Sequence, residues 1–330
     1  MTHILVNEQI PKEIWSEFVL HHPQGTVFQT PEMFEVYLRT SHNSPLAVAL
    51  VEGEKLKGVL LASIIFNGNL FTKAFTARSV IVGGPLVNDS DTCNQLMKAY
   101  LKALPWYVVY SEIRPVFDLQ SLSQVLTESG FRRIGHYNLM MDISLPKEEL
   151  WSRMHKERRR NVSKAEKEGL LFREVSDDED IQAIIGLINR TYQRKRVPLS
   201  YSDIFTVVKS VLKEYVHFFA AYYDGRMIAG QVRLCYGSLV YAWFAGSHED
   251  YFKLRPNDFL MWNVICWAHD SGFELFDFGG GGEPGVEYGV RDYKLKYGCQ
   301  IHDYGRYLSV KNSIIYYLAK QGIRLLKMKK

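Results

Sequence analysis

Two segments of the chain show the same pattern of apolar runs separated by a tight turn. From Leu46 the sequence reads LAVALVEGEKLKGVLLASIIF, and from Val216 it reads VHFFAAYYDGRMIAGQVRLCY. Apolar runs joined by a glycine-containing turn predict a β-hairpin in each segment. Asp224-Gly225 is a strong hairpin signal, because a two-residue turn needs positive φ and glycine adopts it without strain.

Helical patterns surround both hairpins in the same order. We predict helices at 11–21 and 31–40 before the first hairpin, and at 178–195 and 201–213 before the second. After each hairpin a further helix leads into an apolar strand, with DTCNQLMKAYLKALP before WYVVYSEI and NDFLMWNVICWAHDSG before FELFDF. The repeated order indicates an internal duplication. Two unrelated α/β halves are the alternative.

The length of 330 residues suits two hydrophobic cores of ordinary size. We therefore predict an α/β (α+β) fold of two domains, 1–145 and 146–330, each with a mixed, mainly antiparallel sheet flanked by helices. The segment LWSRMHKERRRNVSKAEKEG follows this boundary and predicts one helix with a thin apolar stripe. Its basic residues form either a solvated connector or a surface for phosphates.

Composition excludes several classes of protein. An apolar share of 47% and a charged share of 23% are typical of globular chains, and a net charge of +4 indicates no general nucleic-acid surface. The four cysteines are widely spaced, without a C-x-x-C pair, which argues against a zinc ribbon or a disulfide framework. We expect no metal, no signal peptide and no membrane span, and hence a cytoplasmic protein.

A run of glycines follows the strand FELFDF and formally contains G-x-G-x-x-G at Gly280, Gly282 and Gly285. Only 45 residues remain after Gly285, too few for a dinucleotide-binding domain. We therefore predict a flexible loop at the open end of the second sheet, where backbone can approach a ligand closely.

Several motifs, in order along nearly the whole chain, resemble the Fem-type (FemABX) peptidoglycan bridge aminoacyltransferases of the GNAT acyltransferase superfamily. They are FQTPEMF from Phe28, VIVGGPLV from Val80, RRRNVSKAEKEG from Arg158, TYQR from Thr191 and YGVRDYKLKYG from Tyr288. The last, with its upstream glycines, is the most specific. The chain departs from the family in having Tyr293 and Tyr297 where phenylalanine is usual, and in lacking a long paired-helix arm.

The resemblance implies a transferase that forms an amide bond on the amine of a cell-wall precursor, with aminoacyl-tRNA as donor and no cofactor. Lys294 matches the family's lysine and is the expected catalytic cation beside the developing oxyanion. Lys296 has a weaker case, because it cannot share a helix face with Lys294.

The acceptor would be a nucleotide- or lipid-linked precursor that carries a pyrophosphate, for which arginines are suitable partners. Gln231 and Arg233 share one face of a strand, which either lines a cleft or lies paired beneath a helix. Asp277 and Tyr288 either touch substrate or have structural partners. The expected substrate-binding residues are Arg194, Arg159, Arg160, Gln231, Arg233, Asp277, Gly280, Gly281, Tyr288 and Arg291.

Neither half contains the Gln/Arg-x-x-Gly-x-Gly/Ala turn with which an acyl-CoA-dependent GNAT enzyme holds a pyrophosphate at a helix N-terminus. The second half has SHEDYFKLRPND there, with Pro256 where an amide is wanted. This favours aminoacyl-tRNA as donor. An acyl-CoA- or acyl-carrier-dependent N- or O-acyltransferase acting on a glycan or polysaccharide intermediate is the alternative, and a non-catalytic duplicated binding module is a second.

The last helix, NSIIYYLAKQGIRLLKMKK, is amphipathic. Its apolar side carries Ile315, Leu318 and Leu325, and its basic side carries Lys320, Arg324 and Lys327. Such a helix either docks on a core or makes a peripheral contact with anionic lipid. We expect the active site in the second domain, with the first domain supporting acceptor binding. The sequence predicts no oligomeric state.

Overall fold

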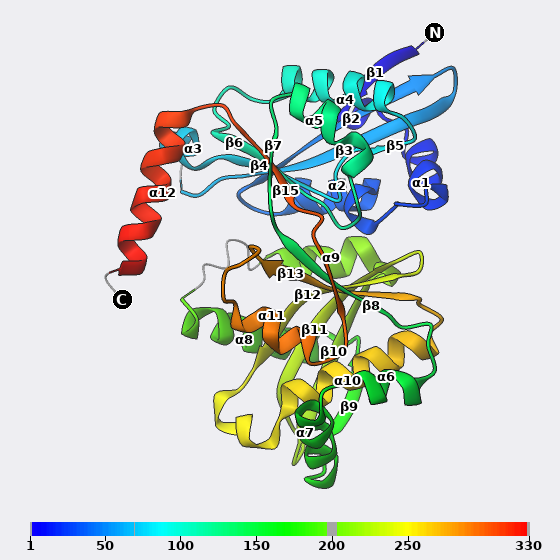
Figure 1. The fold of residues 1–330 in the computed structure, drawn as a ribbon, viewed down its shortest axis with the longest axis vertical. Coiled ribbons are helices and arrows are strands. Elements are labelled where there is room, and N and C mark those ends of the chain that lie inside the picture. Colours follow the sequence, from blue (N-terminus) through cyan, green and yellow to red (C-terminus); the bar gives the residue numbers. More distant parts are fainter. Residues whose placement is uncertain (1, 69, 197–202, 329–330) are drawn as a thin grey trace. The chain divides into compact units, whose positions relative to one another are not determined.

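The computed structural model describes residues 2–68, 70–196 and 203–328, which form two compact units (Figure 1). One unit consists of Met1–Gly135 and Tyr304–Lys330, and the other of His136–Asp303. Each contains one mixed sheet with helices packed on it and its own hydrophobic core. The predicted α/β fold with two mixed sheets is confirmed.

The first unit has the strand order β1-β2-β3-β4-β6-β15-β7, with β5 paired to β3. Its strands are β1 (Thr2–Val6), β2 (Asn43–Glu52), β3 (Lys55–Ile65), β4 (Arg78–Val82), β5 (Leu86–Val87), β6 (Tyr110–Arg114), β7 (Arg132–Ile134) and β15 (Arg306–Val310). Its helices are α1 (Lys12–His21), α2 (Pro31–Arg39), α3 (Leu70–Thr76), α4 (Ser90–Ala103), α5 (Ser123–Glu128) and α12 (Ser313–Met328).

The second unit has the strand order β9-β10-β11-β12-β13-β8-β14. Its strands are β8 (Tyr137–Asp142), β9 (Leu171–Val175), β10 (Val216–Tyr223), β11 (Arg226–Tyr236), β12 (Leu239–Ser247), β13 (Leu275–Gly282) and β14 (Gln300–His302). Its helices are α6 (Lys147–Arg153), α7 (Lys156–Lys167), α8 (Asp178–Arg194), α9 (Ile204–Leu212), α10 (Pro256–Asp270) and α11 (Gly289–Leu295). Short 3-10 helices lie at Asn7–Gln9, Val27–Gln29, Gln120–Leu122, Lys213–Tyr215 and Glu249–Leu254.

The two sheets repeat the same strand order, which is the structural counterpart of the sequence repeat. Apart from β5, each strand of the first sheet has a counterpart at the same place in the second. In order, β1, β2, β3, β4, β6, β15 and β7 correspond to β9, β10, β11, β12, β13, β8 and β14. Both predicted hairpins are present as β2–β3 and β10–β11. Asp224 and Gly225 have φ of 48° and 71°, as a type I′ turn requires.

The units exchange one strand, and this shifts their limits from the predicted boundary at residue 145. The sixth strand of the first sheet is β15, from the end of the chain, which pairs with β6 and β7. The sixth strand of the second sheet is β8, which pairs with β13 and β14. Residues 136–145, assigned from sequence to the first domain, therefore belong to the second unit, and residues 304–330 belong to the first.

The basic segment after β8 forms two helices rather than the single helix expected. Met154 and His155 have extended backbone, which ends α6, and the His155 ring accepts a bond from the amide of Glu157 at the start of α7. The apolar stripe is buried as expected, because Leu150, Met154, Val162 and Ala165 all lie in the core of the second unit.

Candidate active site

Two parallel strands of the second sheet part from each other midway along their length. Residues 239–241 of β12 pair with residues 275–277 of β13, and the ladder between the two strands stops there. Beyond this point β12 stays on β11 up to Ser247, while β13 stays on β8 up to Gly282. In the first sheet the corresponding strands β4 and β6 remain paired over 78–82 and 110–114. The strands therefore part only in the second of these two parallel pairs.

The glycine run lies in strand β13 and not in the flexible loop that the sequence indicated. Gly280 and Gly282 pair with Asn138 and Tyr137 of β8, across two irregularities in register. A Cβ on Gly280 would lie 2.8 Å from the His136 ring, and Gly282 has φ of 79°. The glycines thus let a kinked strand lie tightly against its neighbour. Gly280 is needed because a side chain would not fit, and Gly282 because its φ is positive.

Lys294 reaches the parted strands from the short helix α11. Its Nζ donates a hydrogen bond of 2.9 Å to the carbonyl oxygen of Gly280. A Cβ on Gly279 would lie 3.8 Å from both this Nζ and the hydroxyl of Tyr241, so the missing side chain leaves room beside the ammonium. Burial lowers the pKa of Lys294 to about 8, although Asp277 opposes this shift.

Asp277 supplies a carboxylate near Lys294, on β13 at the point where β12 and β13 part. It is fully buried, and its Oδ1 accepts a bond of 2.6 Å from the amide of Gly279. Its Oδ2 is buried and has no hydrogen-bond partner among the described residues. Burial raises the pKa of Asp277 to about 7, while the Gly279 amide and the charge of Lys294 oppose the rise. A titratable pair with both pKa values displaced toward neutrality is typical of catalytic sites.

Gln231 and Arg233 lie buried beneath helix α10, which is one of the two arrangements that the sequence allowed. Arg233 donates to the Gln231 side chain, to the Val232 carbonyl at 3.1 Å and toward the Met261 sulfur. Burial lowers the pKa of Arg233 to about 10, and its charge also lowers the pKa of Lys294. Arg233 is therefore part of the electrostatic surroundings of Lys294.

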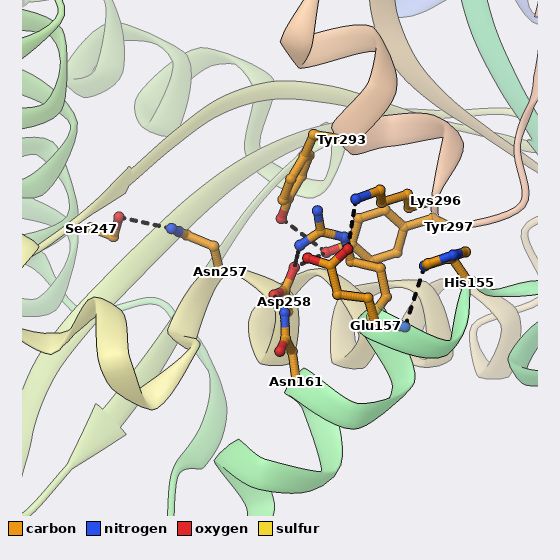
Figure 2. A network of polar contacts seen from close by, with 10 residues as sticks. His155, Glu157, Asn161, Ser247, Asn257, Asp258, Tyr293, Lys296 and Tyr297 are labelled. Carbon is orange, nitrogen blue, oxygen red and sulfur yellow. Dashed lines mark hydrogen bonds and ion pairs between the residues drawn. The ribbon is translucent and has the colours of Figure 1, made fainter.

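A second polar network, which the sequence did not reveal, joins α7, α10 and α11. Asp258 is buried and accepts bonds from Arg158 at 2.7 Å, Asn161 at 2.7 Å and Tyr297 at 2.8 Å (Figure 2). The hydroxyls of Tyr293 and Tyr297 lie 2.9 Å apart. Since Tyr293 precedes Lys294 in α11 and Tyr297 lies just after the end of this helix, the network fixes the helix that carries the lysine.

The remaining predicted residues lie apart from the Lys294–Asp277 pair or support the backbone near it. Arg194 pairs with Glu249 at 2.9 Å and lies over the Phe252 ring. Arg291 donates to the carbonyls of Gly281 at 3.2 Å and Glu283 at 3.1 Å, so it holds the segment after β13 in place. Gly281 lies in β13, Arg159 and Arg160 lie on α7, and the exposed Tyr288 precedes α11.

The displaced pKa of Asp277 predicts a pH-dependent cost to stability. The pKa of the folded carboxyl is raised from its ordinary value of 3.8 to about 7, so the unfolded state binds fewer protons between these two pH values. We expect wild type to lose stability relative to Asp277→Asn as pH rises through this window. Urea midpoints of both proteins across this range measure the difference. A difference that stays constant or grows in favour of wild type contradicts the assignment.

No cluster of three His, Cys, Asp or Glu side chains suited to a metal ion occurs within residues 2–68, 70–196 and 203–328. Across the same ranges, none of the helices is both long and apolar enough to cross a bilayer.

Comparison with known proteins agrees with this architecture. Residues 152–295 match the family model of the acetyltransferase (GNAT) domain. A search of curated proteins gave no significant match. Among solved structures, FemX superimposes with a TM-score of 0.76 at 16% identity, over 96% of this chain and 99% of its own.

Two further structures share the fold. The C-terminal domain (DUF2156) of a protein assigned as a lysylphosphatidylglycerol synthetase in Agrobacterium fabrum has a TM-score of 0.60 at 15% identity, over 95% of this chain and 96% of its own. A tandem GNAT protein from the clavulanic acid biosynthesis pathway has a TM-score of 0.56 at 10% identity, over 94% and 98%. The chain thus has the tandem GNAT fold that these structures share, and its residues 152–295, which match the GNAT domain model, include Lys294.

Proposed function

We propose that the protein is an aminoacyltransferase that forms an amide bond on the amine of a cell-wall precursor, with aminoacyl-tRNA as donor. The observation that carries this proposal is the Lys294 ammonium, held on the Gly280 carbonyl where β12 and β13 part. A half-buried cation at the point where two strands part can stabilise the anionic tetrahedral centre of acyl transfer.

The reaction exchanges an ester bond for an amide bond and moves one proton from nitrogen to oxygen. The acceptor nitrogen attacks the ester carbon, the C–O bond to the ribose oxygen breaks, and that oxygen takes up the proton lost by nitrogen. In this scheme Lys294 donates a hydrogen bond to the oxyanion. Asp277 and Arg233 act in opposite directions on the pKa of Lys294, and Asp277 favours its charged form. Partial burial keeps water from screening the charge.

The first unit supports acceptor binding in this proposal and performs no transfer itself. Its strands β4 and β6 stay paired along the whole of β4, which leaves no parted edge equivalent to that of β12 and β13. The expected site residues Arg159, Arg160 and Arg194 would contact the pyrophosphate of a nucleotide- or lipid-linked acceptor.

We also propose that the protein is cytoplasmic and touches the membrane through α12. Ile314, Tyr317 and Leu318 on this helix are exposed by 74%, 62% and 63%. Exposed apolar and aromatic side chains on a basic amphipathic helix suit an anionic lipid surface. The side chains of Lys320, Arg324, Leu325 and Lys327 lie outside the described residues.

A transfer assay with two donors tests the proposed function. Purified protein is mixed with a nucleotide-linked muramoyl peptide and with either tRNA charged with labelled amino acids or labelled acetyl-CoA. We expect label on the precursor amine from charged tRNA and none from acetyl-CoA. Transfer from acetyl-CoA alone would establish the acyl-CoA alternative, and absence of transfer from either donor would favour a binding module.

A further inference from the structure

A pocket of about 230 Å³ lies beside the N-terminus of α10 and has no role in the steps described above. Two arginines line it, Arg158 from α7 and Arg255 from the residue before α10, together with the rings of Phe252 and Tyr293. All of these residues belong to the second unit. The pocket therefore combines cationic donors with flat apolar walls.

The charges around this pocket leave a positive excess. Asp258 is the carboxylate on its wall, and its two oxygens already accept bonds from Arg158, Asn161 and Tyr297. Arg158 is 8% exposed, and its Nε is buried without a hydrogen-bond partner among the described residues. Since one carboxylate faces two guanidinium groups, an anion in the pocket would balance the charge.

The donors of the pocket are mainly side chains. Pro256 has no amide hydrogen, and the amides of Asp258 and Phe259 both donate to the Arg255 carbonyl at 3.2 Å. Helix α10 adds the positive end of its dipole. Arg255 is exposed and has a φ of 61°, which places it at the helix start in the left-handed region. Asn257 on the wall is held by a 3.0 Å bond to the Ser247 hydroxyl (Figure 2).

We propose that this pocket binds the phosphate of the terminal nucleotide of the RNA donor, a step that rests on the proposed function. Arg158 and Arg255 would pair with the phosphate, because a guanidinium group can donate two parallel hydrogen bonds to phosphate oxygens. Phe252 and Tyr293 add aromatic surface that a base can contact, although Arg194 lies over the Phe252 ring and Arg158 over the Tyr293 ring. Tyr293 precedes Lys294 in α11, so a nucleotide held here lies next to the helix that carries the catalytic cation.

Binding of adenosine 5′-monophosphate, which mimics the terminal nucleotide, tests this site by titration calorimetry. We expect it to bind at least about tenfold more tightly than adenosine, because only the nucleotide pairs with the guanidinium groups. Arg255→Ala should weaken binding by about tenfold, and Arg255→Lys should recover part of the loss. Lys253→Ala is the matched control, since it removes an equal charge from the same turn without lining the pocket.

Equal binding of nucleotide and adenosine, or equal effects of Arg255→Ala and Lys253→Ala, would overturn the proposal. The source of the phosphate is tested by displacement. An uncharged RNA acceptor stem should displace the nucleotide, and coenzyme A should not. Transfer from charged tRNA without nucleotide binding would overturn the role of the pocket and leave the proposed function intact. Nucleotide binding that coenzyme A displaces, without transfer from charged tRNA, would overturn the RNA donor itself.

Discussion

Replacing Lys294 with alanine is expected to lower the turnover of amide formation by about 10²–10³-fold, the usual effect of removing one donor from an oxyanion site. The ammonium is held at the Gly280 carbonyl and is partly shielded from water, so its charge is weakly screened. Initial rates with charged tRNA and precursor measure the effect.

Lys296→Ala is the matched control for this prediction. Lys296 lies two residues along the chain and forms a surface ion pair of 2.6 Å with Glu157, in which its side chain is 37% exposed. Surface pairs of this kind contribute little, so the variant should keep near-normal turnover. Lys294→Met separates loss of charge from loss of packing. Equal rates for the Lys294→Ala and Lys296→Ala proteins would remove the assigned role.

Asp258→Ala is expected to destabilise the protein by about 3–5 kcal/mol, because it leaves the buried Arg158 guanidinium without its counter-ion. The substitution also deprives Asn161 and Tyr297 of their acceptor. Urea unfolding followed by far-UV circular dichroism gives the change in the free energy of unfolding.

Glu157→Ala provides the comparison, since it breaks the exposed pair with Lys296 on the same helix as Arg158. This variant should unfold close to the wild-type midpoint. Similar losses of stability in both variants would contradict a special role for Asp258. An apolar pair at positions 158 and 258 should restore part of the stability lost in Asp258→Ala, because no unpaired charge then remains buried.

The sequence predicted the elements of the fold because their signals are local. The Asp224-Gly225 turn and the alternation of apolar runs need only a few neighbouring residues. Local signals could not predict which of the two sheets β8 and β15 would join. Both strands join their sheets through main-chain ladders with partners far away in sequence, which no local pattern identifies. The glycine run was misread as a loop because glycine carries no apolar pattern that would indicate a strand.

The site was predictable in part. The resemblance singled out Lys294, and the strand position of Asp277 brought it under consideration. Arg158 was passed over in favour of Arg159 and Arg160, although a signal for it exists. Arg158 precedes the buried Val162 by four residues and the buried Ala165 by seven, which places it at the centre of their helix face, whereas Arg159 is half-buried and Arg160 is exposed. The Asp258 network needed coordinates, because Asp258 lies 100 residues from Arg158 and 39 residues from Tyr297 in sequence.

The trading of β8 and β15 between the two sheets also bears on how such a gene can evolve. A simple tandem duplication can be undone, or one copy shuffled into another protein, by a single crossover between the copies. Here a crossover at residue 145 would separate β8 from its partner β13. It would also separate β15 from its partner β6. Recombination would then produce sheets with exposed edges, which are prone to aggregation. Selection against such products would keep the two halves together in one gene.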